Sequence, residues 1–188
     1  MSALIIGVAG PSSTGKTTFC LRLADALPEF FTSIIALDGF RKPDTGDMVS
    51  PASGCAYKDF SNPEYMDFPL VIEQVNANMD KDIVLIEGLF TFFHLPLYSM
   101  LDLKLYFDAP AEERLYRRIL RNTSRNDGST AKSVGEYHLH SASLREWQYV
   151  YPTKSKADII MDGATLSEAG MAVFCKYVRD TRLRSGFV

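Results

Sequence analysis

The stretch GVAGPSSTGKTTFC, from Gly7 to Cys20, places small, turn-forming residues directly between an apolar strand-like segment and an apolar helix-like segment. Its spacing Gly10-x-x-x-x-Gly15-Lys16-Thr17 is the phosphate-binding loop pattern. The glycines let the backbone turn so that successive N–H groups point inward, and the following helix adds its positive N-terminal end. We therefore expect the loop to hold nucleotide phosphates.

The loop predicts roles for its side chains. Lys16 would reach the outer phosphates as a point charge, and the Thr17 hydroxyl would ligate Mg²⁺. The expected nucleotide-binding positions are Gly10, Ser12, Ser13, Thr14, Gly15, Lys16, Thr17 and Thr18. The simpler alternative is a Gly/Ser turn that only caps a helix. The complete spacing, with a strand before it and a helix after it, favours phosphate binding.

The composition fits one ordinary domain over residues 1–188, with 46% hydrophobic residues for a core. The formal net charge is −3 and the pI is near 5.6, so the composition shows no excess of basic residues. This argues against nucleic acid as a partner. The three cysteines, Cys20, Cys55 and Cys175, lack CxxC spacing, so we expect a reducing, cytoplasmic setting. No apolar run approaches the roughly 18 residues of a membrane span, and the sequence carries no signal for an oligomeric state.

Short apolar runs without alternation predict strands that are covered on both faces. They are Ala3–Val8, Ser33–Leu37, Ile83–Ile86, Leu103–Phe107 and Ala157–Met161. Segments of helical period predict helices at Thr17–Leu27, Pro63–Met79, Ala111–Arg121, Val134–Trp147 and Thr165–Arg182. The alternation of strands and helices predicts an α/β fold with a five-stranded parallel sheet flanked by helices. Together with the phosphate-binding loop, it indicates the fold of P-loop nucleoside triphosphate hydrolases.

Two polar stretches, Arg41–Asn62 and Asn122–Ser133, are long for connections inside one domain. Loops of that length are usually functional or mobile. We place a small lid at about residues 121–137 and propose no domain boundary.

Two acids stand where strands end on the loop side of the sheet: Asp38 in IIALDGF and Glu87 in IVLIEGLF. Because ligands of open α/β sheets sit beyond the carboxyl ends of the strands, both acids would face the γ-phosphate. There a carboxylate can bind Mg²⁺ or accept a proton from an attacking hydroxyl. Asp38 could instead cap the next element, whereas Glu87 follows four apolar residues and needs a cation or donor.

The guanine-specific Asn-Lys-x-Asp element of switch GTPases is absent, and PTKSKAD at Pro152–Asp158 does not supply it. This disfavours a switch. An ATPase motor and a kinase stay open at this point.

Six motifs together resemble the uridine kinase and nicotinamide riboside kinase group of P-loop kinases, which includes phosphoribulokinase-like enzymes. They are GPSSTGKTT, LDGFRKP, NPEYMDF, IVLIEGLFTF, LDLKLYFDAPAEERLYRRILR and YPTKSKADIIMDG, and they cover nearly the whole chain in order. The resemblance implies transfer of phosphate from ATP, with Mg²⁺, to the 5′-hydroxyl of a ribonucleoside.

The resemblance also implies roles for individual residues. Asp38 matches the residue that accepts or orients the hydroxyl and adjoins the metal, and Glu87 matches the acid of the magnesium shell. With Lys16 they form the expected catalytic set. The arginine-rich helix matches the segment that closes over the phosphates, with Arg117, Arg121 and Arg125 toward ATP and Arg118 toward the acceptor. The alternative for these arginines is a solvated helix face paired with Glu112 or Glu113.

The chain departs from uridine kinases at the acceptor end. Their NFDHP reads DFSNP here, so Ser61 replaces the Asp that contacts ribose, and Asp59 or Asp67 would have to substitute. Their hairpin before the third strand is missing, because only Phe68–Asp82 intervenes.

The compact length and the missing hairpin move the prediction toward nicotinamide riboside kinases, a resemblance that implies a base held mainly by aromatic stacking. A cationic nicotinamide ring would be attracted to an aromatic face or an acid. The expected acceptor-binding residues are Phe40, Tyr57, Asp59, Ser61, Arg118 and Tyr137. Trp147 is a weaker candidate that we expect to pack its helix. Two alternatives stay open. One is a kinase for uridine, cytidine, pantothenate or a sugar phosphate; the other is a nucleotide-binding regulatory protein without transfer activity.

Overall fold

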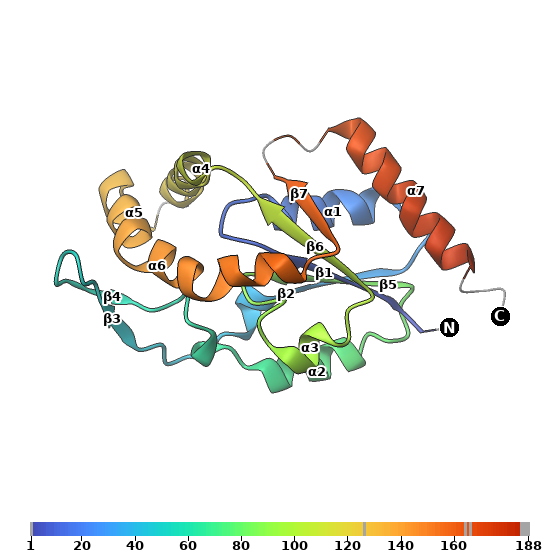
Figure 1. The fold of residues 1–188 in the computed structure, drawn as a ribbon, viewed down its shortest axis with the longest axis horizontal. Helices are drawn as coiled ribbons and strands as arrows, with labels where there is room; N and C mark the ends of the chain where they lie inside the picture. The colour runs from blue at the N-terminus through green and yellow to red at the C-terminus, as the bar shows by residue number, and fades with distance from the viewer. Residues whose placement is uncertain (1, 126, 164, 166, 185–188) are drawn as a thin grey trace.

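The computed structural model describes residues 2–125, 127–163, 165 and 167–184. One sheet of five strands organises this part of the chain (Figure 1). Its members are β1 (Leu4–Ala9), β2 (Thr32–Ala36), β5 (Ile83–Gly88), β6 (Leu103–Asp108) and β7 (Ile159–Asp162). Every pairing is parallel, in the order β2-β5-β1-β6-β7. The predicted α/β fold is confirmed.

Helices cover both faces of the sheet, which explains why the strands read as continuous apolar runs. On one face, α1 (Lys16–Ala26) and α7 (Glu168–Arg184) bury Ile6, Val8 and Leu85. On the other, α2 (Phe68–Asn76) and α3 (Leu95–Tyr98) cover a second apolar cluster (Figure 1). No helix in the described part of the chain is long and apolar enough to cross a membrane.

The turn after β1 depends on glycine. Gly10 has a φ of 136°, and a Cβ there would lie 2.1 Å from the backbone oxygen of Phe107 in β6. Gly15, at the start of α1, has a φ of 94°. Because other residues avoid such angles, the two glycines of the motif are dictated by backbone geometry as well as by any ligand.

The segment predicted as one helix, Pro63–Met79, is divided. A 3₁₀ turn, η2 (Pro63–Tyr65), is followed by an extended Met66, and α2 begins after Asp67, whose side chain accepts the Leu70 N–H at 3.1 Å. The cap at Asp67 fixes the helix start that the sequence pattern placed too early.

The stretch Arg41–Asn62, predicted as a loop, contains an antiparallel hairpin of β3 (Asp47–Val49) and β4 (Ala56–Lys58). Before the hairpin, directly after β2, the chain forms a 3₁₀ turn, η1 (Leu37–Phe40). Between α2 and β5 only residues 77–82 intervene, and they form hydrogen-bonded turns.

A helical arm projects beyond the carboxyl ends of the strands, on the opposite side from both termini (Figure 1). It comprises α4 (Ala111–Thr123), α5 (Ala131–Tyr137), α6 (Ser143–Arg145) between two π-helical segments, His138–Ala142 and Glu146–Val150, and a 3₁₀ segment, Tyr151–Lys156. The helix predicted at Val134–Trp147 is therefore longer and partly wider than an α-helix. Trp147 is 68% exposed and rests on the Tyr151 ring, so it does not pack a core.

Candidate active site

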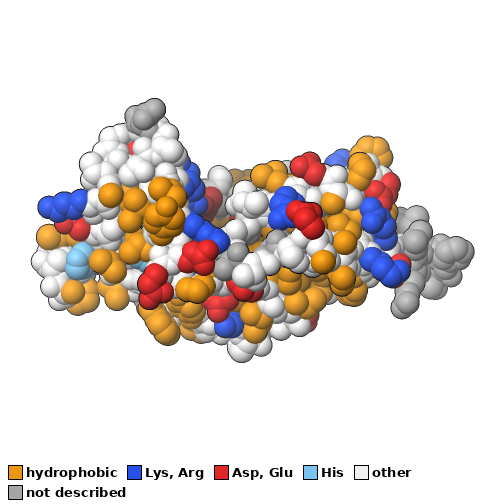
Figure 2. Space-filling view, turned by 90° about the horizontal axis from the view of Figure 1, so that it is seen from above, with side chains coloured by type: hydrophobic (Ala, Val, Ile, Leu, Met, Phe, Trp, Pro, Cys, Tyr) orange, Lys and Arg blue, Asp and Glu red, His pale blue; other side chains and the backbone are white. Residues whose placement is uncertain are grey.

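A cleft of about 970 Å³ lies where the carboxyl ends of the strands meet the helical arm. Lys and Arg side chains line the inner edge of the arm in the space-filling view (Figure 2). The charged residues lining the cleft are Lys16, Asp38, Arg41, Glu87, Arg117, Arg118, Arg121 and Arg125. The cleft is therefore strongly basic, although the whole chain is slightly acidic.

The phosphate-binding loop forms the floor of the cleft. Lys16 is buried, and its Nζ donates to the Pro11 carbonyl at 2.7 Å, which holds the ammonium inside the loop. Burial lowers the pKa of Lys16, whereas the nearby carboxylates of Glu87, Asp38 and Glu146 raise it. Ser13 has a φ of 66°, in the left-handed region, as the tight turn requires.

Glu87 and Thr17 meet on one side of this floor. Glu87 lies in β5 and is buried, and its Oε1 accepts the Thr17 hydroxyl at 2.7 Å. Mg²⁺ in nucleotide sites takes one or two carboxylates together with phosphate oxygens. Glu87, Thr17 and the cleft-lining Asp38 offer the oxygen donors that such an ion needs, so the residues fit the predicted magnesium site.

Asp38 lies in η1 and lines the cleft beside the end of β2. Its Oδ1 accepts from Arg41 Nη2 at 2.6 Å, one turn along the chain. The N-cap of η1 is Ala36, and Asp38 lies inside the turn. The capping alternative is therefore not what the structure shows; Arg41 orients a carboxylate at the cleft wall.

Arginines from α4 and the following turn form the opposite wall. Arg117 donates to the Gly163 carbonyl at 3.1 Å and to Glu113 Oε1 at 2.6 Å. Burial and the charges of Arg118 and Arg125 lower the pKa of Arg121. The Glu113 pair matches the helix-spacing alternative for one arginine, yet Arg117 still lines the cleft.

Several predicted acceptor residues do not line the cleft. Phe40 packs against a core cluster, and Tyr57, on β4, stacks on His140 with ring centroids 5.9 Å apart. Asp59 is 2% exposed; its carboxylate accepts from Arg145 Nε at 3.0 Å and from Asn62 Nδ2 at 3.1 Å. The geometry gives no support to acceptor contacts by these three residues.

Ser61, Arg118 and Tyr137 do line the cleft, as do Ser12, Ser13, Gly15, Lys16, Thr17 and Thr18 from the loop. Gly10 and Thr14, two of the predicted nucleotide-binding residues, do not line the cleft and instead shape the turn of the loop. Thr14 is fully buried, and its hydroxyl donates to the Pro11 carbonyl at 2.9 Å.

The cleft residues that the sequence interpretation missed include Arg41, Phe60, Asn122 and Gly163. Arg41 and Gly163 lie inside the quoted motifs LDGFRKP and YPTKSKADIIMDG, so the signal was present but given no role. Phe60 follows directly on Asp59, and the Arg41 guanidinium lies 5.9 Å from its ring centroid.

A parallel α/β sheet, a phosphate-binding loop after its central strand, an acid in the neighbouring strand and an arginine-lined arm together define a P-loop phosphotransferase site. Residues 69–168 match the family model described as "Phosphoribulokinase / Uridine kinase family". The chain belongs to this family and is a phosphotransferase.

Similar proteins extend over nearly the whole chain. The uridine kinase of Borreliella burgdorferi (strain ZS7) is 28% identical over 208 residues, covering 97% of this chain and 95% of that protein. Uridine-cytidine kinase B of Dictyostelium discoideum is 27% identical, covering 84% and 73%. The crystal structure of APE1195 has a TM-score of 0.62 at 15% identity, covering 96% of this chain and 97% of that one, a likeness of fold alone.

Proposed function

We propose that the protein transfers the γ-phosphate of Mg·ATP to the 5′-hydroxyl of a neutral pyrimidine nucleoside, uridine or cytidine. Family membership and the names of the similar proteins support the reaction class. They favour this acceptor over nicotinamide riboside, which the sequence interpretation had preferred.

The acceptor wall of the cleft carries the proposal. Among the described residues, Arg41 Nε, Arg118 Nε and the Tyr137 hydroxyl are buried without a hydrogen-bond partner, and all three residues line the cleft. Buried polar groups in folded proteins are nearly always satisfied, so each calls for a ligand atom or water. Two of the three are obligate donors, which suits the carbonyl oxygens of a pyrimidine base.

The same wall disfavours a cationic ring. The Arg41 guanidinium lies 5.9 Å from the Phe60 ring centroid and the Arg118 guanidinium 5.1 Å from that of Tyr137, and like charges in a partly buried site repel. The cleft's two acids, Asp38 and Glu87, are assigned in this proposal to the attacking hydroxyl and to Mg²⁺. Nicotinamide riboside would therefore place its positive ring against guanidinium groups.

In this mechanism Asp38 accepts or orients the proton of the attacking hydroxyl, and Arg41 holds the carboxylate in place. Lys16 and the arginines of α4 stabilise the charge on the transferring phosphoryl oxygens. Thr17 and Glu87 would hold Mg²⁺, which supplies charge neutralisation between the phosphates.

Nicotinamide riboside remains the second candidate because only residues 77–82 separate α2 from β5. The deciding experiment compares kcat/KM for uridine, cytidine and nicotinamide riboside with Mg·ATP, with products identified by mass spectrometry. Uridine or cytidine monophosphate as the preferred product supports the proposal. A preference for nicotinamide riboside would reject the charge argument, and ATP binding without transfer to any acceptor would favour the regulatory alternative.

A further inference from the structure

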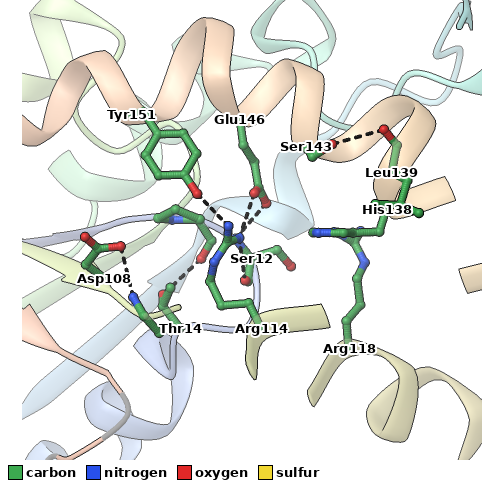
Figure 3. Close-up of polar contacts among 12 residues, drawn as sticks. Ser12, Thr14, Asp108, Arg114, Arg118, His138, Leu139, Ser143, Glu146 and Tyr151 are labelled. Carbon is green, nitrogen blue, oxygen red and sulfur yellow. Dashed lines mark hydrogen bonds and ion pairs between the residues drawn. The ribbon is translucent and has the colours of Figure 1, made fainter. Parts of the chain in front are cut away.

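One charged cluster beside the cleft has no place in the mechanism above. Glu146, in the π-helical segment after α6, is fully buried. Its Oε1 accepts the backbone N–H of Ser12 in the phosphate-binding loop at 2.9 Å, and its Oε2 accepts from Arg114 Nη1 at 2.7 Å (Figure 3). The carboxylate therefore joins the loop to α4.

Arg114 completes the connection. It is 2% exposed, its Nη1 also lies 3.4 Å from the Ser12 carbonyl, and its Nη2 donates to the Tyr151 hydroxyl at 2.5 Å (Figure 3). Three segments far apart in sequence meet here: the phosphate-binding loop, the first turn of α4, and residues 146–151. We call Arg114, Glu146 and Tyr151 the clamp.

The clamp is more readily explained by geometry than by stability. Burying two charges costs about as much as their attraction returns, and apolar residues of similar volume often serve equally well. The ion pair can instead fix the orientation of the segments that it joins, because the planar guanidinium makes several hydrogen bonds at fixed angles.

The orientation of Arg114 matters because this residue lies on α4 together with three arginines that line the cleft. Arg117, Arg118 and Arg121 follow it by three, four and seven residues, which places all four on one side of the helix. Fixing Arg114 against Ser12 therefore fixes the rotation of α4 and the distance of its arginines from the loop.

We propose that Glu146 and Arg114 are positioning residues that hold the arginines of α4 at the distance and orientation needed to contact the nucleotide phosphates. The inference rests on nucleotide use by this cleft, as in the proposed function, but not on the identity of the acceptor. Glu146 acts through a backbone amide and through Arg114, and touches no reacting atom.

The test uses Arg114→Lys. This variant keeps the buried charge beside Glu146 but loses the planar guanidinium, whose two Nη atoms reach Ser12 and Tyr151 at the same time. The equilibrium dissociation constant for Mg·ATP, measured by calorimetry without acceptor, should rise about tenfold. The KM for the acceptor should stay within about twofold. Glu29→Gln is the matched control, since it removes a carboxylate from an exposed pair with Arg179 at 2.6 Å, and it should change neither value.

A double-mutant cycle separates positioning from general destabilisation. Arg121→Gln alone should weaken ATP binding, and its effect should shrink when Arg114→Lys is already present, because the displaced helix no longer presents Arg121 correctly. Tyr151→Phe, which removes one hydroxyl and leaves the ion pair, should give a smaller effect in the same direction. It serves as the second variant if Arg114→Lys does not fold.

Each outcome bears on the inference separately from the acceptor. Additive losses, or an unchanged ATP dissociation constant in folded Arg114→Lys and Tyr151→Phe, would overturn it even if uridine is phosphorylated. A tenfold, non-additive loss supports it even if the acceptor proves to be another compound. Failure of the wild-type protein to bind Mg·ATP would overturn both the clamp and the proposed function.

Discussion

Replacing Asp59 by Asn should destabilise the protein while leaving the recognition of the acceptor unchanged. Asp59 is 2% exposed, and both of its oxygens accept from Arg145 Nε, at 3.0 and 3.1 Å. Arg145 Nη2 adds a bond of 2.5 Å to Oδ2, and Asn62 Nδ2 a bond of 3.1 Å to the same atom. The carboxylate thus ties the end of the hairpin to α6 instead of facing the cleft.

The magnitude follows from this burial. Breaking a buried ion pair by removing one charge costs about 3–5 kcal/mol. The Arg145 side chain is 20% exposed and Asn keeps a hydrogen-bonding oxygen, so we expect about 2–3 kcal/mol. For a chain of this size each kcal/mol shifts Tm by about 2–4 °C, which gives a fall of roughly 4–12 °C.

The assay is thermal unfolding followed by circular dichroism, together with the KM for uridine measured well below the lower Tm. Asp47→Asn is the control, because Asp47 pairs with Lys58 at 2.8 Å on the exposed hairpin surface and its loss should cost under about 1 kcal/mol. If Asp59→Asn keeps the wild-type Tm and raises the KM for the nucleoside tenfold or more, Asp59 contacts ribose and the structural argument fails.

Three further predictions concern the phosphate end of the cleft. Asp38→Asn should bind ATP normally and lose about 10²–10⁴-fold in kcat, and unchanged turnover would remove Asp38 from the mechanism. Glu87→Gln should raise the Mg²⁺ concentration needed for half-maximal activity, and a magnesium titration with the wild-type midpoint would contradict its assignment. Gly10→Ala should unfold at lower temperature and lose ATP binding, since its Cβ would lie 2.1 Å from the Phe107 oxygen at a φ of 136°; a fully stable variant would refute the packing argument.

The sequence predicted the sheet well because its strands are buried on both faces. Each run without alternation became a strand within two residues of the expected bounds, since a strand covered by helices needs apolar side chains on both sides. The hairpin β3–β4 escaped prediction for the opposite reason. Its strands have three residues each, and most of their side chains are exposed, so no apolar run marks them.

The same contrast explains which parts of the site could be predicted. The phosphate end is built from consecutive residues whose backbone does the binding, so spacing alone specifies it. Arg117, Arg118 and Arg121 share one helix and are equally visible in sequence. The residues that the proposal assigns to the acceptor, Arg41, Phe60 and Tyr137, lie in separate segments of the chain.

The acidic residues show why a local sequence pattern is a poor guide to the acceptor end of the cleft. Asp59 stands two positions from Ser61 and was a reasonable substitute for the ribose ligand, but nothing near it in sequence reveals that Arg145 holds it from a distance of 86 residues. Glu146 reaches Ser12 across 134 residues in the same way. Arg145 therefore neutralises an acid outside the cleft, whereas Glu146 braces the loop that would hold the phosphates. We infer that the arm acts on the phosphate end of the cleft through Glu146, so that substitutions of Glu146 will weaken ATP binding although 134 residues separate it from Ser12 in sequence.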